Sequence, residues 1–158
     1  MGGELENAHP PQVFSYNVTL ITDYGKTITK LPDYPIESIM QANGKQVDRY
    51  SRWANGCAVI INKTTVFFAG GRTSGLDNNY LKETFYLNLE TKEWTRGPDL
   101  SLARHTLTCS LISKPFPQIV IVDGWPTTKL VEILNLATNE LTRGIANTFF
   151  ISFSTIPK

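Results

Sequence analysis

The sequence predicts an all-β fold made of repeated four-stranded antiparallel units. Residues 84–97 (TFYLNLETKEWTRG) and residues 131–144 (VEILNLATNELTRG) are identical at eight of fourteen positions. Short runs of β-branched and aromatic residues end at glycine-containing turns, which is the pattern of β-strands. No segment longer than about ten residues has a clean 3.6-residue apolar period, so long helices are not expected.

A second pair of similar segments precedes the first pair in the same order. Residues 52–61 align with residues 104–113, and each segment has an arginine five residues before a cysteine. Both segments lead into an apolar run that ends in a turn, residues 66–71 (VFFAGG) and 119–124 (IVIVDG). The ordered series predicts a tandem repeat of about 50 residues.

The best-defined repeat contains four short strands. A hairpin at Asn62-Lys63-Thr64 joins the first two strands, and Gly70-Gly71 ends the second because glycine tolerates backbone angles that other residues resist. Pro98 closes the unit, since proline cannot donate a hydrogen bond to a neighbouring strand. The expected strands are residues 57–61, 65–69, 84–89 and 93–96.

These markers together resemble the kelch repeat. The repeat has a diglycine after an apolar strand, Tyr86 in the next strand, Trp94 eight residues later, then Pro98, and Arg104 opens the next unit. The resemblance implies a kelch-type β-propeller, in which about five to seven four-stranded antiparallel blades surround a central channel. The next unit has Asp123-Gly124 for the diglycine, Ile133 for the tyrosine and Leu141 for the tryptophan, which indicates a diverged blade.

The resemblance divides the chain into successive parts of a propeller. The N-terminus aligns with the second half of a blade, with Ile28 in the position of Trp94, and Ile36, Ile39 and Met40 predict a short helix in the loop that follows. The expected parts are half a blade (1–33), an inserted loop (34–51), a complete blade (52–102), a diverged blade (103–144) and an apolar tail (145–158).

About two and a half blades cannot close a ring, so a blade face and strand edges would stay bare. We therefore expect the remaining blades to come from a longer parent protein or from self-association.

Composition disfavours several classes of function. The net charge is +1 and no basic stripe is present, so nucleic acid is not an expected partner. No apolar run has the length of a membrane span, and Met1 is not followed by a signal-peptide pattern. Cytoplasmic and secreted locations both stay open.

No catalytic or cofactor-binding motif stands out either. The two histidines, His9 and His105, share no ligand spacing and cannot assemble the copper site of galactose oxidase, whose propeller has kelch-like repeats. We therefore predict no metal, no cofactor and no enzymatic activity. Cys57 and Cys109 occupy the same place in successive blades, which we expect to be too far apart for a disulfide, so both are interpreted as buried thiols.

Loop lengths point to one propeller face as a binding surface. The connection from Pro32 to Arg52 is 14 residues longer than the equivalent one from Pro98 to Arg104, and the loop at 72–81 emerges on the same face. Trp94 and Tyr86 are expected in the core, and the recurring arginines also suit a contact between blades. The residues expected to contact a partner are Arg52, Trp53, Arg72, Asn78, Tyr80, Arg104, His105 and Trp125.

The resemblance implies a non-catalytic module that binds an unknown protein partner through these loops. The alternative is a fragment of a secreted or galactose-oxidase-like kelch protein with a carbohydrate or other extracellular ligand. Two N-glycosylation tripeptides, at Asn17 and Asn62, would matter only in a secreted protein.

Overall fold

The computed structural model describes residues 19–22, 27–36, 39, 52–74, 80–126 and 129–145, and the side chains of the first two strands are not among them. The strands of this part of the chain are β1 (Thr19–Thr22), β2 (Thr27–Lys30), β3 (Arg52–Ala54), β4 (Cys57–Ile60), β5 (Thr65–Ala69), β6 (Arg72–Ser74), β7 (Thr84–Asn88), β8 (Trp94–Arg96), β9 (Thr108–Ile112), β10 (Gln118–Val122), β11 (Leu130–Asn135) and β12 (Glu140–Ile145).

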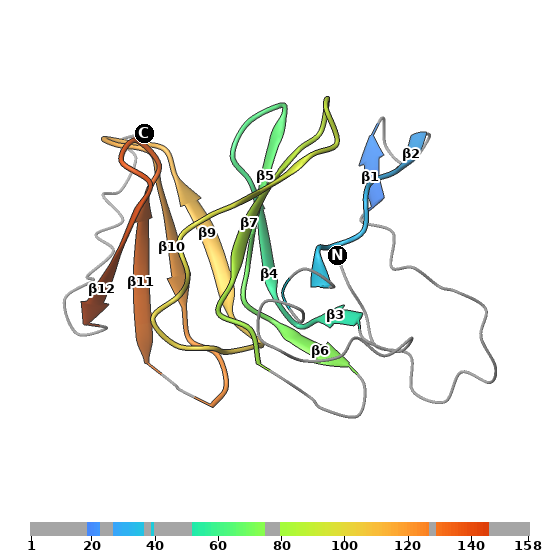
Figure 1. Cartoon of the computed structure of the whole chain (residues 1–158). Coiled ribbons are helices and arrows are strands. Elements are labelled where there is room, and N and C mark those ends of the chain that lie inside the picture. The colour runs from blue at the N-terminus through green and yellow to red at the C-terminus, as the bar shows by residue number, and fades with distance from the viewer. Residues whose placement is uncertain are drawn as a thin grey trace, which may run out of the picture.

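Two four-stranded antiparallel sheets form the body of the molecule (Figure 1). The middle blade has the order β4-β5-β7-β8, and the C-terminal blade has the order β12-β11-β10-β9. In both blades each strand pairs with its neighbours in the repeat, as in an up-and-down meander. The predicted all-β fold with four-stranded antiparallel blades is therefore confirmed.

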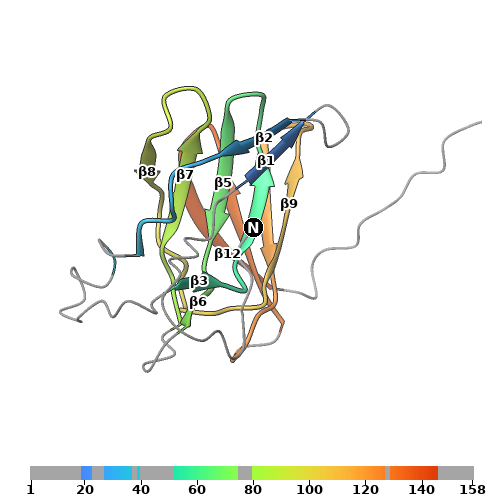
Figure 2. The ribbon, with the colours of Figure 1, turned by 90° about the vertical axis from the view of Figure 1, so that its right-hand side faces the viewer.

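The middle blade is buried on both faces, which explains why β5 lacks an alternation of apolar and polar residues. Val66 and Phe68 point into one apolar cluster, and Phe67 and Ala69 point into another. The second cluster fills the space between the two blades, where Ile121 of β10 also lies. Figure 2 shows the blades side by side in a second view. Stacking against neighbours on both sides is the packing that propeller blades require.

The turn between the third and fourth strands repeats in atomic detail. The Asn88 side chain accepts hydrogen bonds from the backbone N–H groups of Glu90 (2.8 Å) and Thr91 (3.1 Å). Asn135, 47 positions later, accepts from the next residues in the same way, at 2.8 and 3.3 Å. The identical Leu-Asn-Leu segments therefore encode the same asparagine-capped turn.

The backbone angles show why Asp123-Gly124 can replace the diglycine. Gly70 and Gly71 have φ values of 56° and 103°, and Asp123 and Gly124 have values of 57° and 113°. Asp123 tolerates the left-handed region because its side chain accepts a hydrogen bond from the backbone N–H of Lys129 (3.0 Å). Gly71 is also sterically required, since a Cβ there would lie 2.6 Å from the Trp53 ring.

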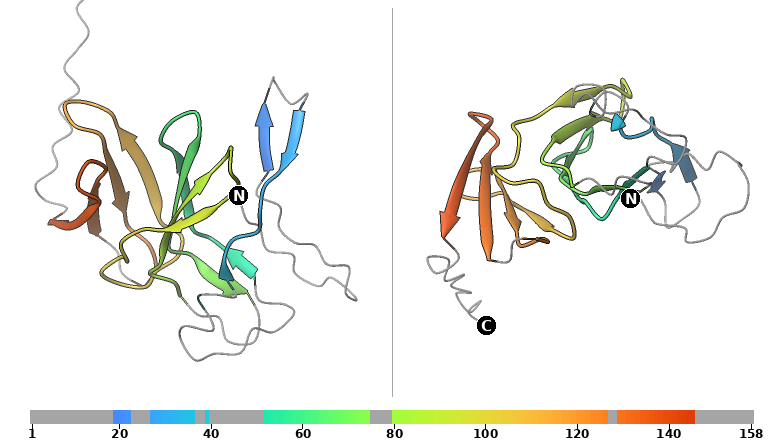
Figure 3. Two further views of the ribbon diagram at one scale, coloured as in Figure 1. Left: turned by 45° about the horizontal axis from the view of Figure 1, so that its top comes forward. Right: turned by 60° about the horizontal axis from the view of Figure 1, so that its bottom comes forward.

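A disulfide joins Cys57 to Cys109, so the prediction of two free thiols was wrong. The two Cα atoms lie 5.8 Å apart, within the usual range for a disulfide. The prediction assumed that adjacent blades are equally far apart at their inner and outer strands. β4 and β9 are the first strands of adjacent blades, and they contact each other, so equivalent positions on them are close although the outer strands diverge (Figure 3).

The segment before the middle blade also packs against it. Ile36 and Ile39 are helical residues, and the backbone N–H of Ile39 donates to the carbonyl of Pro35 (3.3 Å). Both isoleucines are buried in the same cluster as Phe68. β1 and β2 form an antiparallel hairpin, which suits the third and fourth strands of a preceding blade. The boundaries of the five parts stay predictions, and the tail beyond Ile145 lies outside the described residues.

Candidate functional site

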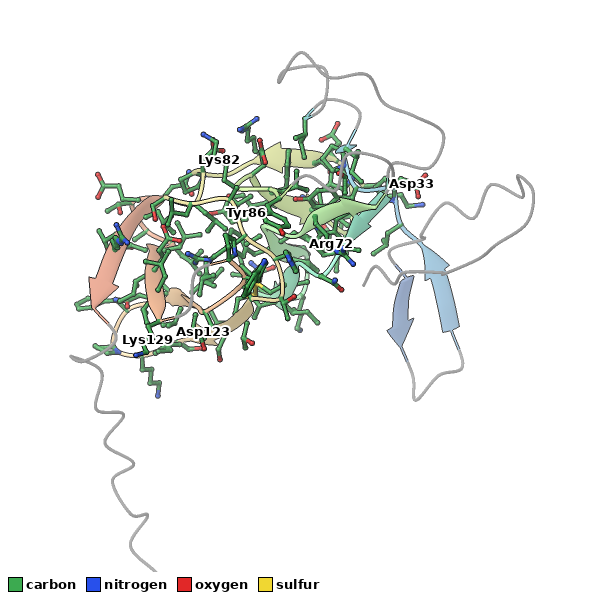
Figure 4. All side chains as sticks on the ribbon, turned by 90° about the horizontal axis from the view of Figure 1, so that it is seen from below. Asp33, Arg72, Lys82, Tyr86, Asp123 and Lys129 are labelled. Atoms are coloured by element: carbon green, nitrogen blue, oxygen red, sulfur yellow. A yellow bond between two sulfur atoms is a disulfide. The ribbon has the colours of Figure 1, made fainter. Side chains whose placement is uncertain are left out.

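Three connections converge at one end of the two blades, as expected for second-to-third and fourth-to-first loops. The β5–β7 connection, the β8–β9 connection and the β10–β11 connection all lie at the lower end in Figure 1. The short sheet of β3 and β6, which the sequence did not predict, extends the middle blade at this end. Figure 4 views this end directly and places Arg72, Asp123 and Lys129 on it. We call it the loop face.

Backbone hydrogen bonds tie the connections of the loop face together. Gly71 donates to the carbonyl of Arg104 (2.8 Å), and Arg104 donates to the carbonyl of Leu81 (3.0 Å). His105 and Trp125 exchange two backbone bonds of 3.1 and 2.8 Å, which tie the β8–β9 connection to the β10–β11 connection. The side chains on these loops are therefore presented by a braced backbone.

An aromatic row lies on this backbone, formed by Tyr80, His105 and Trp125. The rings of Tyr80 and His105 have centroids 4.8 Å apart, and Trp125 is paired with His105 in an isolated antiparallel β-bridge. Trp125 is 59% exposed and Tyr80 is 39% exposed, whereas His105 is half-buried. Two large aromatic side chains thus face solvent at positions where no packing against the blades requires them.

Polar groups flank the aromatic row. Arg72 forms a β-bridge with Tyr80 at one end, and its side chain is half-buried. Asp123 and Lys129 are exposed at the other end, in the same loop as Trp125. The His105 Nδ1 atom lies 2.7 Å from the hydroxyl of Thr106, which fixes the orientation of the imidazole. The surface therefore combines aromatic area with charges of both signs.

Two of the predicted contact residues belong to the core, so their assignment to the surface is corrected. Trp53 is 5% exposed, stacks on Tyr34 with centroids 4.7 Å apart, and donates from Nε1 to the Gly70 carbonyl (2.7 Å). Trp53 thus anchors the inserted segment to the middle blade. It cannot contact a partner without opening that core.

Arg104 is the second correction: its backbone forms hydrogen bonds with Gly71 and Leu81 of the middle blade, and its buried side chain pairs with the C-terminal blade. Its side chain is 0% exposed, and its Nη2 atom lies 2.7 Å from the Glu132 carboxylate on β11. The same carboxylate accepts a hydrogen bond from the backbone N–H of Ser101 (2.8 Å). Burial lowers the pKa of Arg104, and the negative charge of Glu132 opposes that shift. The sequence had left this structural role open for the recurring arginines.

The other predicted residues divide between the loop face and the undescribed positions. Arg72, Tyr80, His105 and Trp125 come together on the loop face. Asn78 lies outside the described residues, and so does the side chain of Arg52. Sequence reasoning missed Asp123 and Lys129 as surface groups, although the left-handed turn that presents them was visible in the Asp-Gly dipeptide.

Of the aromatic residues expected in the core, Trp94 and Tyr86 behave differently. Trp94 packs edge-on against Phe68, with centroids 5.0 Å apart, and is partly buried. Tyr86 packs against Phe67, but its hydroxyl donates to the Asn139 side chain in the next blade (2.7 Å). Tyr86 therefore also fastens the two blades to each other.

The described ranges show neither a metal-binding group nor a membrane-crossing helix. Within them, no cluster of three or more histidine, cysteine, aspartate or glutamate side chains has the arrangement of a metal site. No helix in that same part of the chain is long and apolar enough to cross a bilayer.

Comparison with known proteins supports the repeat. Residues 54–101 match the family model described as the Kelch motif, which covers the middle blade from the end of β3 to just past β8. A search of the curated proteins finds no match to the chain. The matched segment, the four-stranded antiparallel blades and the all-β architecture agree with one another: residues 54–101 are similar to a kelch repeat, and the fold is that of a kelch-type β-propeller fragment.

Proposed function

We propose that this chain is a non-catalytic module that binds a protein partner through the aromatic row of the loop face. The observation that carries the proposal is the exposure of Tyr80 and Trp125 on a backbone braced across two blades. Tryptophan, tyrosine and arginine dominate the energetics of protein interfaces, because each offers a large contact area with a polar group.

The braced backbone lowers the entropic cost of binding. Loops that are ordered before a partner arrives do not lose conformational freedom during association. The bridge between His105 and Trp125 and the bridge between Arg72 and Tyr80 hold both exposed rings in this way. Half-buried Arg72 places a cationic side chain at one end of the row.

The experiment compares two exposed aromatic residues on opposite ends of one blade. Trp125 lies on the loop face, whereas Phe116, 66% exposed, lies in the β9–β10 hairpin at the other end. Partners captured by the intact chain are quantified beside those captured by Trp125→Ala and Phe116→Ala. The proposal predicts a protein that Trp125→Ala loses at least about tenfold and Phe116→Ala retains, since hot-spot truncations cost about 2 kcal/mol or more. Equal capture by both variants would contradict it.

The alternative of an extracellular carbohydrate ligand is favoured by the Cys57–Cys109 disulfide. Disulfides persist mainly in oxidising compartments, where glycans are common ligands. An exposed tryptophan beside a carboxylate, as at Trp125 and Asp123, can stack on a sugar ring and bind its hydroxyl groups. Binding of the intact chain to an array of glycans, abolished by Trp125→Ala, would identify this second function in place of the first.

A further inference from the structure

The hairpin between β4 and β5 carries an exposed asparagine in a defined turn. Asn62 and Lys63 are exposed at its tip, and the Ile61 N–H donates to the Thr65 carbonyl (2.9 Å) where the strands end. The tripeptide Asn62-Lys63-Thr64 has the form of an N-glycosylation acceptor. An acceptor at a hairpin tip is accessible to an enzyme without any opening of the blade.

The side chains of this tripeptide are arranged around one atom. The Asn62 Oδ1 atom accepts hydrogen bonds from the backbone N–H of Thr64 (2.9 Å) and from the Thr64 hydroxyl (3.1 Å). The asparagine and the threonine side chains therefore lie on the same side of the turn. The Asn62 Nδ2 atom, which would be modified, makes no hydrogen bond within the described part of the chain.

The disulfide is an independent observation that points to the same compartment. Cys57 lies in β4, the strand that leads into this hairpin, and it is bonded to Cys109 of the next blade. Structural disulfides form in the secretory pathway and are rare in the cytosol. Asparagine glycosylation takes place in that pathway, so a chain that acquires the bond is exposed to the glycosylation machinery.

The position of Asn62 is compatible with partner binding. In the β4–β5 pair, Cys57 lies opposite Ala69 beside the loop face, and Ile60 lies opposite Val66 at the other end. Asn62 lies in the turn between β4 and β5, which is at the upper end in Figure 1, whereas Tyr80 and Trp125 belong to the β5–β7 and β10–β11 connections at the lower end. A glycan there leaves the loop face open.

We propose that Asn62 is an N-glycosylation site on the propeller end opposite the loop face. The donor is a lipid diphosphate-linked oligosaccharide, transferred by the oligosaccharide transferase of the host cell. The Nδ2 atom forms a bond to C1 of the first sugar, the C1–oxygen bond to the diphosphate breaks, and the lipid diphosphate leaves. Nδ2 loses one proton in the exchange, and no oxidation or reduction takes place. The proposal stands apart from the identity of the binding partner.

The test expresses the complete chain behind a secretion leader in cultured animal cells, with Asn17→Gln present so that only one acceptor tripeptide remains. The readouts are the electrophoretic shift after treatment with an amide-cleaving glycosidase, and the mass of the peptide that contains Asn62. The proposal predicts one glycan, lost completely in Asn62→Gln and Thr64→Ala. Thr64→Ser keeps the hydroxyl and should keep the glycan. This control separates the loss of the hydroxyl in Thr64→Ala from any other effect of a substitution at position 64.

Recovery of the Asn17→Gln chain with an unmodified Asn62 peptide and an intact disulfide would overturn the proposal. A shift that persists in Asn62→Gln would overturn it as well, since the sugar would then lie elsewhere. An unchanged thermal midpoint of Asn62→Gln made in bacteria shows that the substitution itself leaves the blade folded.

Discussion

Loss of the Cys57–Cys109 disulfide should destabilise the pair of blades strongly. The bond joins residues 52 positions apart, and it links the first strands of two blades that otherwise contact each other through an apolar cluster and through backbone hydrogen bonds such as that from Gly71 to Arg104. Replacing both cysteines by alanine removes this link and takes only one sulfur atom from each side chain. The double alanine variant is therefore the informative perturbation.

The magnitude follows from the length of the closed loop. For a loop of about 52 residues, cross-linking lowers the entropy of the unfolded chain by about 14 cal/mol/K, or about 4 kcal/mol at room temperature. For a domain of this size each 1 kcal/mol shifts the melting temperature by about 2–4 °C. The double variant should then melt about 8–16 °C below the oxidised chain.

The assay is thermal unfolding followed by circular dichroism, with and without a thiol reductant. The oxidised chain should lose stability in reductant, whereas the double variant should not respond to it. Equal melting temperatures for the oxidised and reduced chains would refute the reasoning. So would alkylation of two thiols in the purified chain without prior reduction, because the bond would then be absent.

Three other predictions probe the core. Burial, together with the negative charge of Glu83, raises the pKa of Tyr34, so above about pH 10 only the unfolded state releases this proton. The free energy of unfolding of the intact chain should therefore fall by about 1.4 kcal/mol per pH unit above about pH 10 in denaturant titrations, and Tyr34→Phe should remove this part of the loss. Arg104→Ala should lower the free energy of unfolding in urea by about 3–5 kcal/mol, because it leaves the buried Glu132 charge without its partner. The double variant Arg104→Met with Glu132→Leu should recover most of that stability. Trp94→Ala should cost about 3 kcal/mol by the same measurement.

Each of these predictions has a result that would contradict it. An identical alkaline slope for Tyr34→Phe and the intact chain would show that the hydroxyl ionises as readily folded as unfolded. A double substitution at 104 and 132 no more stable than Arg104→Ala would mean that the arginine acts through something other than the ion pair. An unchanged melt of Trp94→Ala would remove that ring from the core.

The strands were predictable because their signals are local. The runs at 57–61 and 65–69 became β4 and β5 with changes of at most one residue, since a β-branched run between turn residues leaves few alternatives. The similarity between segments 47 positions apart also predicted the C-terminal blade, although its aromatic positions differ. There Asn135 caps the same turn as Asn88, and Asp123 has the left-handed backbone of Gly70. The repeat thus predicted a blade that the residues of its single strands alone would not have identified.

The contacts between blades could not be predicted, because they depend on how the sheets converge. Cys57 and Cys109 are 52 positions apart, and only the approach of β4 to β9 brings them together. Trp53 was assigned to the surface because it matches no marker of the repeat, yet it packs under the inserted Tyr34. The β3–β6 pair was missed for a related reason, since three-residue strands carry too little pattern to recognise.

The most direct test of the proposed binding face places a photoreactive phenylalanine analogue at position 125, and separately at position 116, in the complete chain. Irradiation in cells should link position 125, and not position 116, to a defined protein, and Tyr80→Ala should weaken that adduct about tenfold or more. Identical adducts from both positions, or an adduct at 125 that is insensitive to Tyr80→Ala, would contradict the assignment of partner binding to the loop face.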